Sequence, residues 1–202
     1  MTKKPVVMVV DDDSGVRNAM RALLKSVGLE SALYPSAQEF LTAWQPAQPG
    51  CLVLDIRMPG MSGLELQEQL NLRGAIIPVI FMTGHGDVPM AVEAMQHGAF
   101  DFLQKPFRDQ DLLDRIQKAI ARDSKLRTSL GEHDRIRSHL ETLTAREREV
   151  LDLMTQGKQN KAIAQDLGVS PRTIEIHRAR VMEKMNAHSV AELVRMMLDL
   201  TR

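Results

Sequence analysis

Acidic side chains stand directly after two short apolar runs in the first third of the sequence. Asp11 and Asp12 follow the run at 6–10, and Asp55 follows the run at 51–54. Carboxylates that gather at one place repel one another unless a cation joins them, and a hard cation such as Mg²⁺ prefers oxygen ligands. An aspartate carboxylate can also act as the nucleophile toward a phosphoryl group. These residues predict a site for phosphoryl transfer with Mg²⁺ as the cofactor.

A hydroxyl and an ammonium group complete this pattern. Thr83 closes the apolar run that begins at 78, and Lys105 comes just after the run at 100–103. A threonine hydroxyl can donate a hydrogen bond to a phosphoryl oxygen, and a lysine ammonium can pair with it. Each residue alone is a weak signal, but the ordered set favours a site over solvated loops. Asp13 is open to two interpretations, a pocket residue or the solvated start of a helix, and the second is favoured.

The apolar runs that precede these residues alternate with helical patterns. We expect strands at 6–10, 30–34, 51–54, 78–82 and 100–103, and helices at 14–27, 36–44, 63–72, 88–97 and 109–121. This alternation predicts an α/β doubly wound fold with a five-stranded parallel sheet. Ligands bind at the carboxyl ends of the strands in such sheets, so the polar residues are expected to meet at one edge.

Length and composition describe a globular protein of two ordinary domains. The chain has 202 residues, is 44% hydrophobic and carries no net charge, with −2 on residues 1–122 and +2 on the rest. That asymmetry is too small to indicate nucleic-acid binding by itself. The single cysteine, Cys51, suits a reducing compartment and is expected to be a buried, inert thiol. With no signal peptide and no apolar segment of about 18 residues, the protein is expected to be cytoplasmic and not membrane-embedded.

The composition changes after residue 122, where strand-like runs disappear. Leu126, Leu130, Ile136 and Leu140 keep an approximate helical spacing that Gly131 interrupts. Two interpretations remain open: a solvated helix that continues the last helix of the first domain, or a short dimerising coiled coil. We therefore expect a first domain, a helical linker and an all-α second domain of four helices, at residues 1–122, 123–142 and 143–202.

The second domain contains a helix-turn-helix pattern at 159–185. A glycine-containing turn at 168–170 separates two short helices, and Ile174, Val181 and Met185 fall on one stripe of the second helix, which predicts its core face. The DNA contacts are expected on the opposite face and on the preceding helix, at Lys161, Arg172, Thr173, Glu175, Ile176, Arg178, Ala179 and Arg180. An amphipathic bundle with a solvated basic face is the alternative, and the turn disfavours it.

The chemistry of that exposed face suits the major groove of DNA. Glu175 can accept from cytosine N4, Ile176 can touch a thymine methyl group, and the arginines suit phosphate or guanine. Lys161 is the best phosphate contact outside the recognition helix. His177 is favoured as a packing or backbone-positioning residue over a base contact.

The first domain resembles the receiver domain of bacterial response regulators over residues 5–121. The matching motifs are Val-Val-Asp-Asp-Asp at 9–13, Leu-Asp-Ile-Arg-Met-Pro-Gly-Met-Ser-Gly at 54–63, Thr-Gly-His-Gly-Asp at 83–87 and Lys-Pro-Phe at 105–107. The resemblance implies a flavodoxin-like fold and a phosphoaspartate at Asp55. It implies that Asp12 binds Mg²⁺ directly, Asp11 through water and Arg57 through its backbone carbonyl, with Asp55 as a further ligand.

The same resemblance implies a switch around the phosphoryl group. Thr83 would move toward it, Phe102 would turn inward with Thr83, and Lys105 would stabilise the phosphoryl oxygens. The bond before Pro106 is often cis in the family.

The second domain resembles the LuxR-type helix-turn-helix. The motifs are Leu-Thr-Ala-Arg-Glu at 143–147 and Gly-Val-Ser-Pro-Arg-Thr-Ile-Glu-Ile-His at 168–177. Pro-Arg-Thr-Ile-Glu-Ile-His-Arg at 171–178 and Gly-His-Gly-Asp-Val-Pro-Met-Ala-Val-Glu-Ala-Met at 84–95 are most similar to the FixJ subgroup. Some relatives carry a basic residue where Glu175 stands, so their operators are not transferred to this chain.

Together the two resemblances imply a transcription regulator of a two-component system. A sensor histidine kinase would phosphorylate Asp55, and the protein would then dimerise, bind promoter DNA and, with RNA polymerase, activate transcription. The only catalysis implied is its own phosphorylation and dephosphorylation. The fourth helix, fifth strand and fifth helix of the receiver would form the dimer surface, whose segments contain Met90, Val92, Met95, Arg108 and Asp111.

Other functions fit the sequence less well. A phosphohydrolase resembling the haloacid dehalogenase class needs a second acid two residues after its nucleophile, where this chain has Arg57. A receiver whose basic tail binds only protein would show no preference among DNA sequences. A soft-metal site at His85 and His97 lacks further ligands.

Overall fold

The computed structural model describes residues 3–84 and 88–200 and divides the chain into two compact units, Met1–Arg127 and Thr128–Arg202. Among the described helices, none combines the length and the apolar character needed to span a bilayer.

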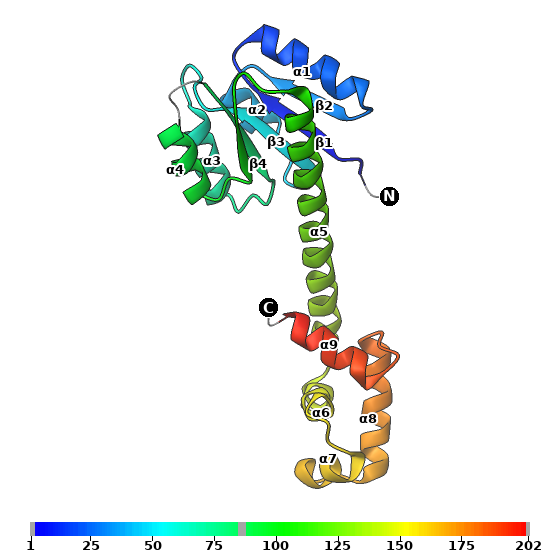
Figure 1. Ribbon diagram of the computed structural model, residues 1–202. Helices are drawn as coiled ribbons and strands as arrows, with labels where there is room; N and C mark the ends of the chain where they lie inside the picture. The colour runs from blue at the N-terminus through cyan, green and yellow to red at the C-terminus, as the bar shows by residue number, and fades with distance from the viewer. Residues whose placement is uncertain (1–2, 85–87, 201–202) are drawn as a thin grey trace. The chain divides into compact units, whose positions relative to one another are not determined.

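The first unit is built on a five-stranded parallel sheet in the order β2-β1-β3-β4-β5, which confirms the predicted α/β fold (Figure 1). The strands are β1 Val6–Val10, β2 Glu30–Tyr34, β3 Gly50–Asp55, β4 Val79–Thr83 and β5 Asp101–Gln104. Val10 lies opposite Leu54, and Met82 lies opposite Asp55. This register brings Asp11, Asp55 and Thr83 to the same edge of the sheet.

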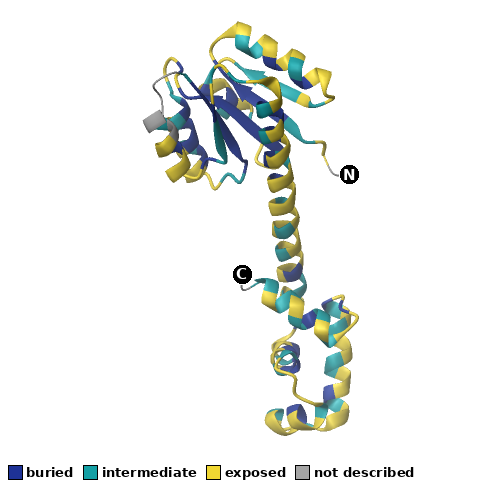
Figure 2. Cartoon of the chain, viewed as in Figure 1, coloured by how far each residue is buried: buried dark blue, intermediate teal, exposed yellow. Residues whose placement is uncertain are grey.

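Helices cover both faces of the sheet. They are α1 Ser14–Ser26, α2 Ala37–Ala43, α3 Gly63–Leu72, α4 Val88–Gln96 and α5 Asp109–Glu141. Side chains of α2, α3 and α4 pack with Leu52 and Leu54 on one face, while those of α1 and α5 pack with Cys51 and Val53 on the other. Because β3 is buried on both faces, its continuous apolar run is required by the fold (Figure 2).

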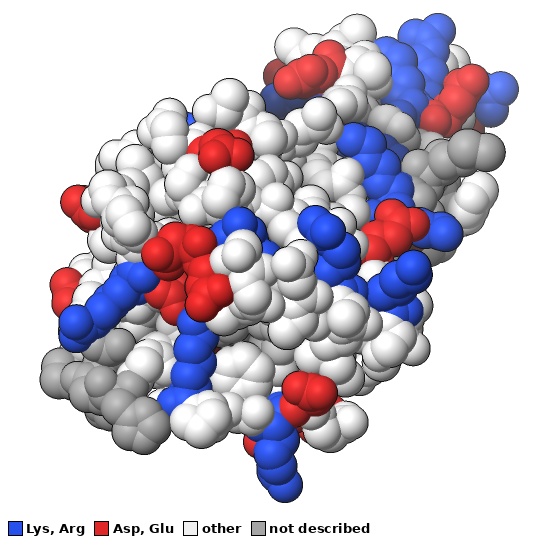
Figure 3. Space-filling model, turned by 90° about the horizontal axis from the view of Figure 1, so that it is seen from above, with Lys and Arg blue, Asp and Glu red and all other residues white. Residues whose placement is uncertain are grey.

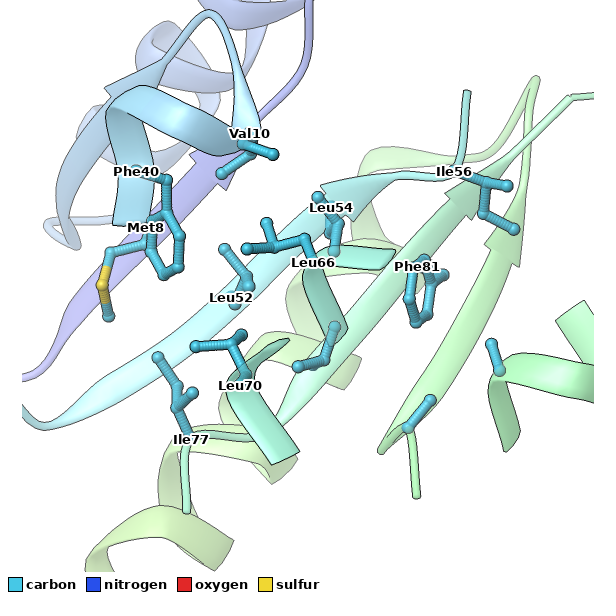
Figure 4. Close-up of a cluster of buried hydrophobic side chains, with 14 of the residues drawn as sticks. Met8, Val10, Phe40, Leu52, Leu54, Ile56, Leu66, Leu70, Ile77 and Phe81 are labelled. Carbon is cyan, nitrogen blue, oxygen red and sulfur yellow. The ribbon is translucent and has the colours of Figure 1, made fainter. Parts of the chain in front are cut away.

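The cluster on the α2–α3–α4 face anchors the strand that ends in Asp55. Leu66 and Leu70 of α3 lie beside Leu52 of β3, and Phe81 of β4 lies in the same cluster (Figure 4). All four side chains are at most 1% exposed. Close packing of this kind resists displacement, so the carboxyl end of β3 is held on a rigid base.

The last helix of the first unit continues into the predicted linker. The pattern predicted a helix at 109–121, and α5 runs without a break from Asp109 to Glu141, which agrees with the interpretation of the linker as a helix that continues it. Gly131 lies inside the helix, and nothing lies within 4 Å of a side chain built there. A single glycine costs a helix only about 1 kcal/mol, which is too little to end one that is supported on either side. The boundaries of the linker at 122 and 142 remain predictions.

The second unit is helical. Its further helices are α6 Ala145–Thr155, α7 Asn160–Leu167, α8 Pro171–Lys184 and α9 Val190–Leu200. Ile174, Val181 and Met185 are fully buried, as the predicted core stripe requires. They pack with Ile163 of α7, with α6 and with α9. The expected all-α helix-turn-helix domain is confirmed.

Candidate phosphoryl-acceptor pocket and DNA-binding surface

Asp55 lies at the carboxyl end of β3 and contacts the one ammonium group that sequence reasoning assigned to this pocket. Lys105 Nζ is 2.6 Å from Asp55 Oδ1 and 3.0 Å from Asp11 Oδ2. The other oxygen of Asp55 accepts from the backbone N–H of Arg57 at 2.9 Å. Asp11 is 1% exposed and Asp55 is 9% exposed. The predicted Asp11, Asp55 and Lys105 therefore meet in one largely buried cluster.

Burial sets the electrostatics of this cluster. Loss of solvation raises the pKa of the Asp55 carboxyl, and the neighbouring Asp11 raises it further, while the hydrogen bond and charge of Lys105 oppose the rise. Burial works to lower the pKa of Lys105, but hydrogen bonds from Lys105 to the two carboxylates outweigh it and raise that pKa. The pocket thus holds two carboxylates around one cation, and it would gain stability from further positive charge.

The start of α3 also supports the acceptor strand. A side chain at Gly63 would collide with the backbone oxygen of Asp55, so only glycine permits this approach. The N–H of Gly63 donates to the carbonyl of Ile56 at 2.9 Å. Ser62 and Glu65 close the N-terminus of α3 with a reciprocal capping box.

The remaining acidic residues lie outside the buried cluster. Asp13 caps α1, because its Oδ1 accepts from the N–H groups of Gly15 and Val16. The favoured interpretation of Asp13 as the start of the helix therefore holds. Asp12 is exposed in the same loop. In the view from above, one group of acidic side chains lies next to Lys and Arg side chains, and further acidic side chains are spread over the same face (Figure 3).

Thr83 and Phe102 occupy neighbouring strands. Thr83 ends β4 and is 2% exposed, and Phe102 lies on β5 opposite Phe81 of β4. Phe102 is half-buried and packs against the α2–α3–α4 core cluster. The Lys105–Pro106 peptide bond is cis, as the resemblance implied.

The donor chemistry of the pocket suits a hard divalent cation. Asp11 and Asp55 supply carboxylate oxygens at one place, and oxygen is the ligand atom that Mg²⁺ prefers. Among the described residues, however, no three His, Cys, Asp or Glu side chains are grouped closely enough to hold a metal ion. The residues fit Mg²⁺ if Asp12 turns inward or backbone and water oxygens complete the set.

Cys51, His97 and His85 were also considered for thiol or metal chemistry. Cys51 is buried, and burial followed by the nearby Asp123 raises the pKa of its thiol to about 12. It is the inert thiol that was expected. His97 is exposed, and His85 lies outside the described residues.

The helix-turn-helix is formed by α7, a tight turn and α8. Gly168 has φ of 65° in this turn, a conformation that favours glycine. Ser170 caps α8 by accepting from the N–H of Thr173, and Pro171 occupies the first turn. The sequence signals for the turn therefore match the backbone that α8 requires.

The predicted DNA-contacting residues mostly face solvent. Six of them are exposed and two are half-buried; the exposed ones are Lys161, Arg172, Glu175, Ile176, Ala179 and Arg180, and the half-buried ones are Thr173 and Arg178. Arg172 and Glu175 pair with each other at 2.9 Å. Because the pair is exposed, breaking it costs little free energy, so Arg172 and Glu175 are available to contact DNA instead.

A hollow beside this face adds residues that sequence reasoning missed. It is lined by both α7 and α8 and includes Lys158, Gln159, Asn160, Lys161 and Arg178. Lys158 pairs with Asp166 at 2.7 Å. The start of α7 was visible in the sequence, but only the fold brings Arg178 next to it. His177 is half-buried with an unpartnered, buried Nδ1 within the described chain, which fits packing better than base contact.

A buried ion pair supports the recognition helix and was also missed. Lys184 at the end of α8 donates to Glu147 Oε2 at 2.6 Å and to the Thr142 carbonyl at 3.0 Å. Glu147 is 2% exposed and forms the predicted capping box with Thr144. The hydrogen bond from Lys184, then that from Thr144, lowers the pKa of Glu147 to about 2.

Two supports of the receiver had no signal in the sequence. Arg17 of α1 donates to the carbonyl of Asp11 at 2.6 Å. Asp123 of α5 is 1% exposed and accepts from Gly50 N at 2.9 Å and from Arg127 Nε at 2.8 Å. Arg127 also donates to the carbonyls of Pro46 and Gln48. A helical pattern shows these residues only as part of a polar face.

Each of the two units matches a known protein family. Residues 7–117 match the response regulator receiver domain, and residues 141–197 match the luxR family of bacterial regulatory proteins. The chain therefore belongs to the response regulators in which a receiver is joined to a LuxR-type DNA-binding domain, a family of transcription regulators rather than classical enzymes.

Individual relatives match over almost the whole chain. The transcriptional regulatory protein FixJ of Azorhizobium caulinodans is 49% identical over 95% of this chain and 91% of its own. Nodulation protein W of Bradyrhizobium diazoefficiens is 47% identical over 96% and 85%. The solved structure of the response regulator StyR is 46% identical with a TM-score of 0.90 over 96% and 98%. Full-length FixJ from B. japonicum is 42% identical with a TM-score of 0.62 over 99% and 98%.

Proposed function

We propose that this protein is switched by phosphorylation of Asp55 and that the switch controls binding of its helix-turn-helix to promoter DNA. The observation that carries the proposal is the contact of Lys105 with both Asp11 and Asp55 at the edge of the sheet. Response regulators of this kind interact with histidine kinases and promoter DNA. The phosphoryl donor is accordingly the phosphohistidine of a sensor kinase.

The transfer step uses the chain's own residues as follows. An Asp55 oxygen forms a bond to phosphorus while the P–N bond of the donor breaks, and the released histidine nitrogen takes up a proton. Lys105 leaves the Asp55 carboxylate and pairs with a phosphoryl oxygen. Asp11, Asp12, Asp55 and the backbone carbonyl of Arg57 would hold Mg²⁺, which neutralises charge on the phosphoryl oxygens when bound.

The phosphoryl group is read through Thr83 and Phe102. The buried Thr83 hydroxyl moves to donate to a phosphoryl oxygen, and Phe102 on the adjacent strand repacks into the space that Thr83 leaves. The repacking alters the surface of α4, β5 and α5. Val92 and Met95 of α4 are large apolar side chains that are 50% and 40% exposed, which suits a surface that a second phosphorylated copy covers.

Dimerisation would bring two recognition helices to adjacent half-sites on DNA. Glu175 and Ile176 then contact base edges in the major groove. The other predicted contacts hold the helix in the groove, and they are Lys161, Arg172, Thr173, Arg178, Ala179 and Arg180. The bound dimer recruits RNA polymerase and activates transcription in the cytoplasm. The chain also returns to its resting state by hydrolysing its own phosphoaspartate.

A direct test is phosphorylation by a small acyl phosphate in the presence of Mg²⁺, measured by intact-protein mass spectrometry. We expect one phosphoryl group on the natural chain and none on Asp55→Asn. Asp109→Asn, which removes an exposed acid at the start of α5, is the matched control and should be phosphorylated normally. Equal phosphorylation of the Asp55 variant would contradict the assignment. Sustained turnover of small phosphoesters would instead favour a phosphohydrolase.

A further inference from the structure

The side chain of Arg17 reaches back from α1 to the end of β1. Its Nη1 donates to the backbone carbonyl of Asp11 at 2.6 Å, across six residues of chain. The backbone N–H of Arg17 donates to Asp13 at 3.1 Å, which fixes the residue in the first turn of α1. Arg17 is half-buried, and its hydrogen bond to the Asp11 carbonyl is partly shielded from water.

Every polar group of Asp11 is held. Its N–H donates to the Tyr34 carbonyl at 3.2 Å, its Oδ1 accepts from Asp13 N at 2.9 Å, and its Oδ2 accepts from Lys105 at 3.0 Å. Arg17 supplies the fourth contact, on the carbonyl. A peptide unit is planar, so a fixed carbonyl of Asp11 also fixes the N–H of Asp12 and the plane from which the Asp12 side chain departs.

We propose that Arg17 is a positioning residue for the Mg²⁺ site, a role that rests on the function proposed above. It holds the Asp11–Asp12 peptide so that the two carboxylates present their oxygens to one cation, and it does not itself contact the cation. Partners behind the ligands of a metal commonly decide its affinity in this way.

The sign of the effect separates this role from simple charge. A guanidinium beside two acids repels a cation, so charge alone predicts that removal of Arg17 tightens Mg²⁺ binding. Positioning predicts the opposite, because a released peptide lets the carboxylates turn away. A merely structural residue would lower the free energy of unfolding and leave the affinity for Mg²⁺ unchanged.

The test is a calorimetric titration of the full chain with Mg²⁺ alone, at physiological ionic strength and without a phosphoryl donor. We expect Arg17→Met to weaken binding by about tenfold. Arg17→Lys keeps the charge and a shorter donor, and should lie between Arg17→Met and the natural chain. Arg21→Met removes an exposed arginine one turn along α1 and should bind as the natural chain does. If Arg17→Met fails to fold, weaker Mg²⁺ binding by Arg17→Lys than by the natural chain would support the proposal.

Affinities of both Arg17 variants equal to or tighter than that of the natural chain would overturn the positioning role. Asp11→Asn separates this failure from failure of the proposed function. If the natural chain binds no Mg²⁺, or if Asp11→Asn binds it equally well, then the magnesium site itself is wrong. If Asp11→Asn loses binding while Arg17→Met keeps it, only the role of Arg17 is wrong.

Discussion

The two units of this protein place their functional charges in opposite environments. Asp11 and Asp55 in the receiver are almost fully buried and share Lys105, whereas Glu175 and Arg172 on the recognition helix are exposed and pair with each other. The buried charge of the DNA-binding unit is instead Glu147, which supports the fold. If the proposed function holds, burial makes the receiver sensitive to one added phosphoryl group, and exposure lets the DNA-contacting side chains change without cost to the fold.

The largest effect is expected when the receiver pocket loses the ammonium group of Lys105. Lys105→Met keeps the aliphatic volume but leaves Asp11 and Asp55 without an ammonium and deprives the phosphoryl oxygens of their partner. Loss of one such preorganised charge typically costs about a hundredfold in rate. We expect that loss in the rate of phosphorylation by a small acyl phosphate at saturating Mg²⁺. A rate within about twofold of the natural chain would show that the buried cation is not needed.

The next largest effect is expected for the ion pair of Asp123 and Arg127, which lies outside the phosphoryl-acceptor pocket and affects stability. Arg127→Ala leaves Asp123 buried and without its guanidinium, and breaking such a pair costs about 3 kcal/mol. We expect this loss in the free energy of unfolding of the receiver, measured by urea denaturation of the full chain. Lys125→Ala changes an exposed residue of the same helix and should leave that free energy unchanged. Equal stability of the two variants would contradict a structural role for the pair.

The buried charge of the DNA-binding unit is tested through pH. The pKa of Glu147 is lowered to about 2 in the folded chain, so its contribution to stability is present above its ordinary pKa near 4.5 and is lost as pH falls toward 2. Glu147→Gln should lower the free energy of unfolding by about 2 kcal/mol near neutral pH. Denaturation across this range should show the two curves converging in acid. If the difference in the free energy of unfolding between the two proteins stays constant with pH, the charge of Glu147 does not stabilise the fold.

The smallest effects are expected for the exposed side chains of the DNA-binding unit. Lys161→Ala should weaken binding to all DNA sequences about equally and reduce the salt slope by about one. The free energy of unfolding should not change, because Lys161 is exposed. Fluorescence anisotropy at several salt concentrations measures both quantities. A loss confined to one DNA sequence would make Lys161 a base-reading residue instead of a phosphate contact.

The parts of this structure that follow local patterns could be predicted from the sequence. The apolar run at 51–54 predicted β3 and placed Asp55 at its carboxyl end. The glycine and proline around the turn predicted where α7 ends and where α8 begins. The contacts that Arg127 of α5 makes could not be predicted, because its partners Pro46 and Gln48 lie about eighty positions away in the sequence. Lys184 was missed because its partners Glu147 and Thr142 lie in another part of the chain. Arg17 was missed because a helical pattern does not show which side chain turns back onto the preceding strand.

We propose above that the phosphoryl group on Asp55 controls the DNA-binding unit. The most direct test of this control is the affinity for a DNA sequence obtained by selection in vitro, measured with and without an acyl phosphate donor and Mg²⁺. We predict that the donor tightens binding by the natural chain about tenfold, a typical coupling between two sites, and has no effect on Asp55→Asn. Equal tightening of both proteins would show that Asp55 is not the residue through which the donor acts.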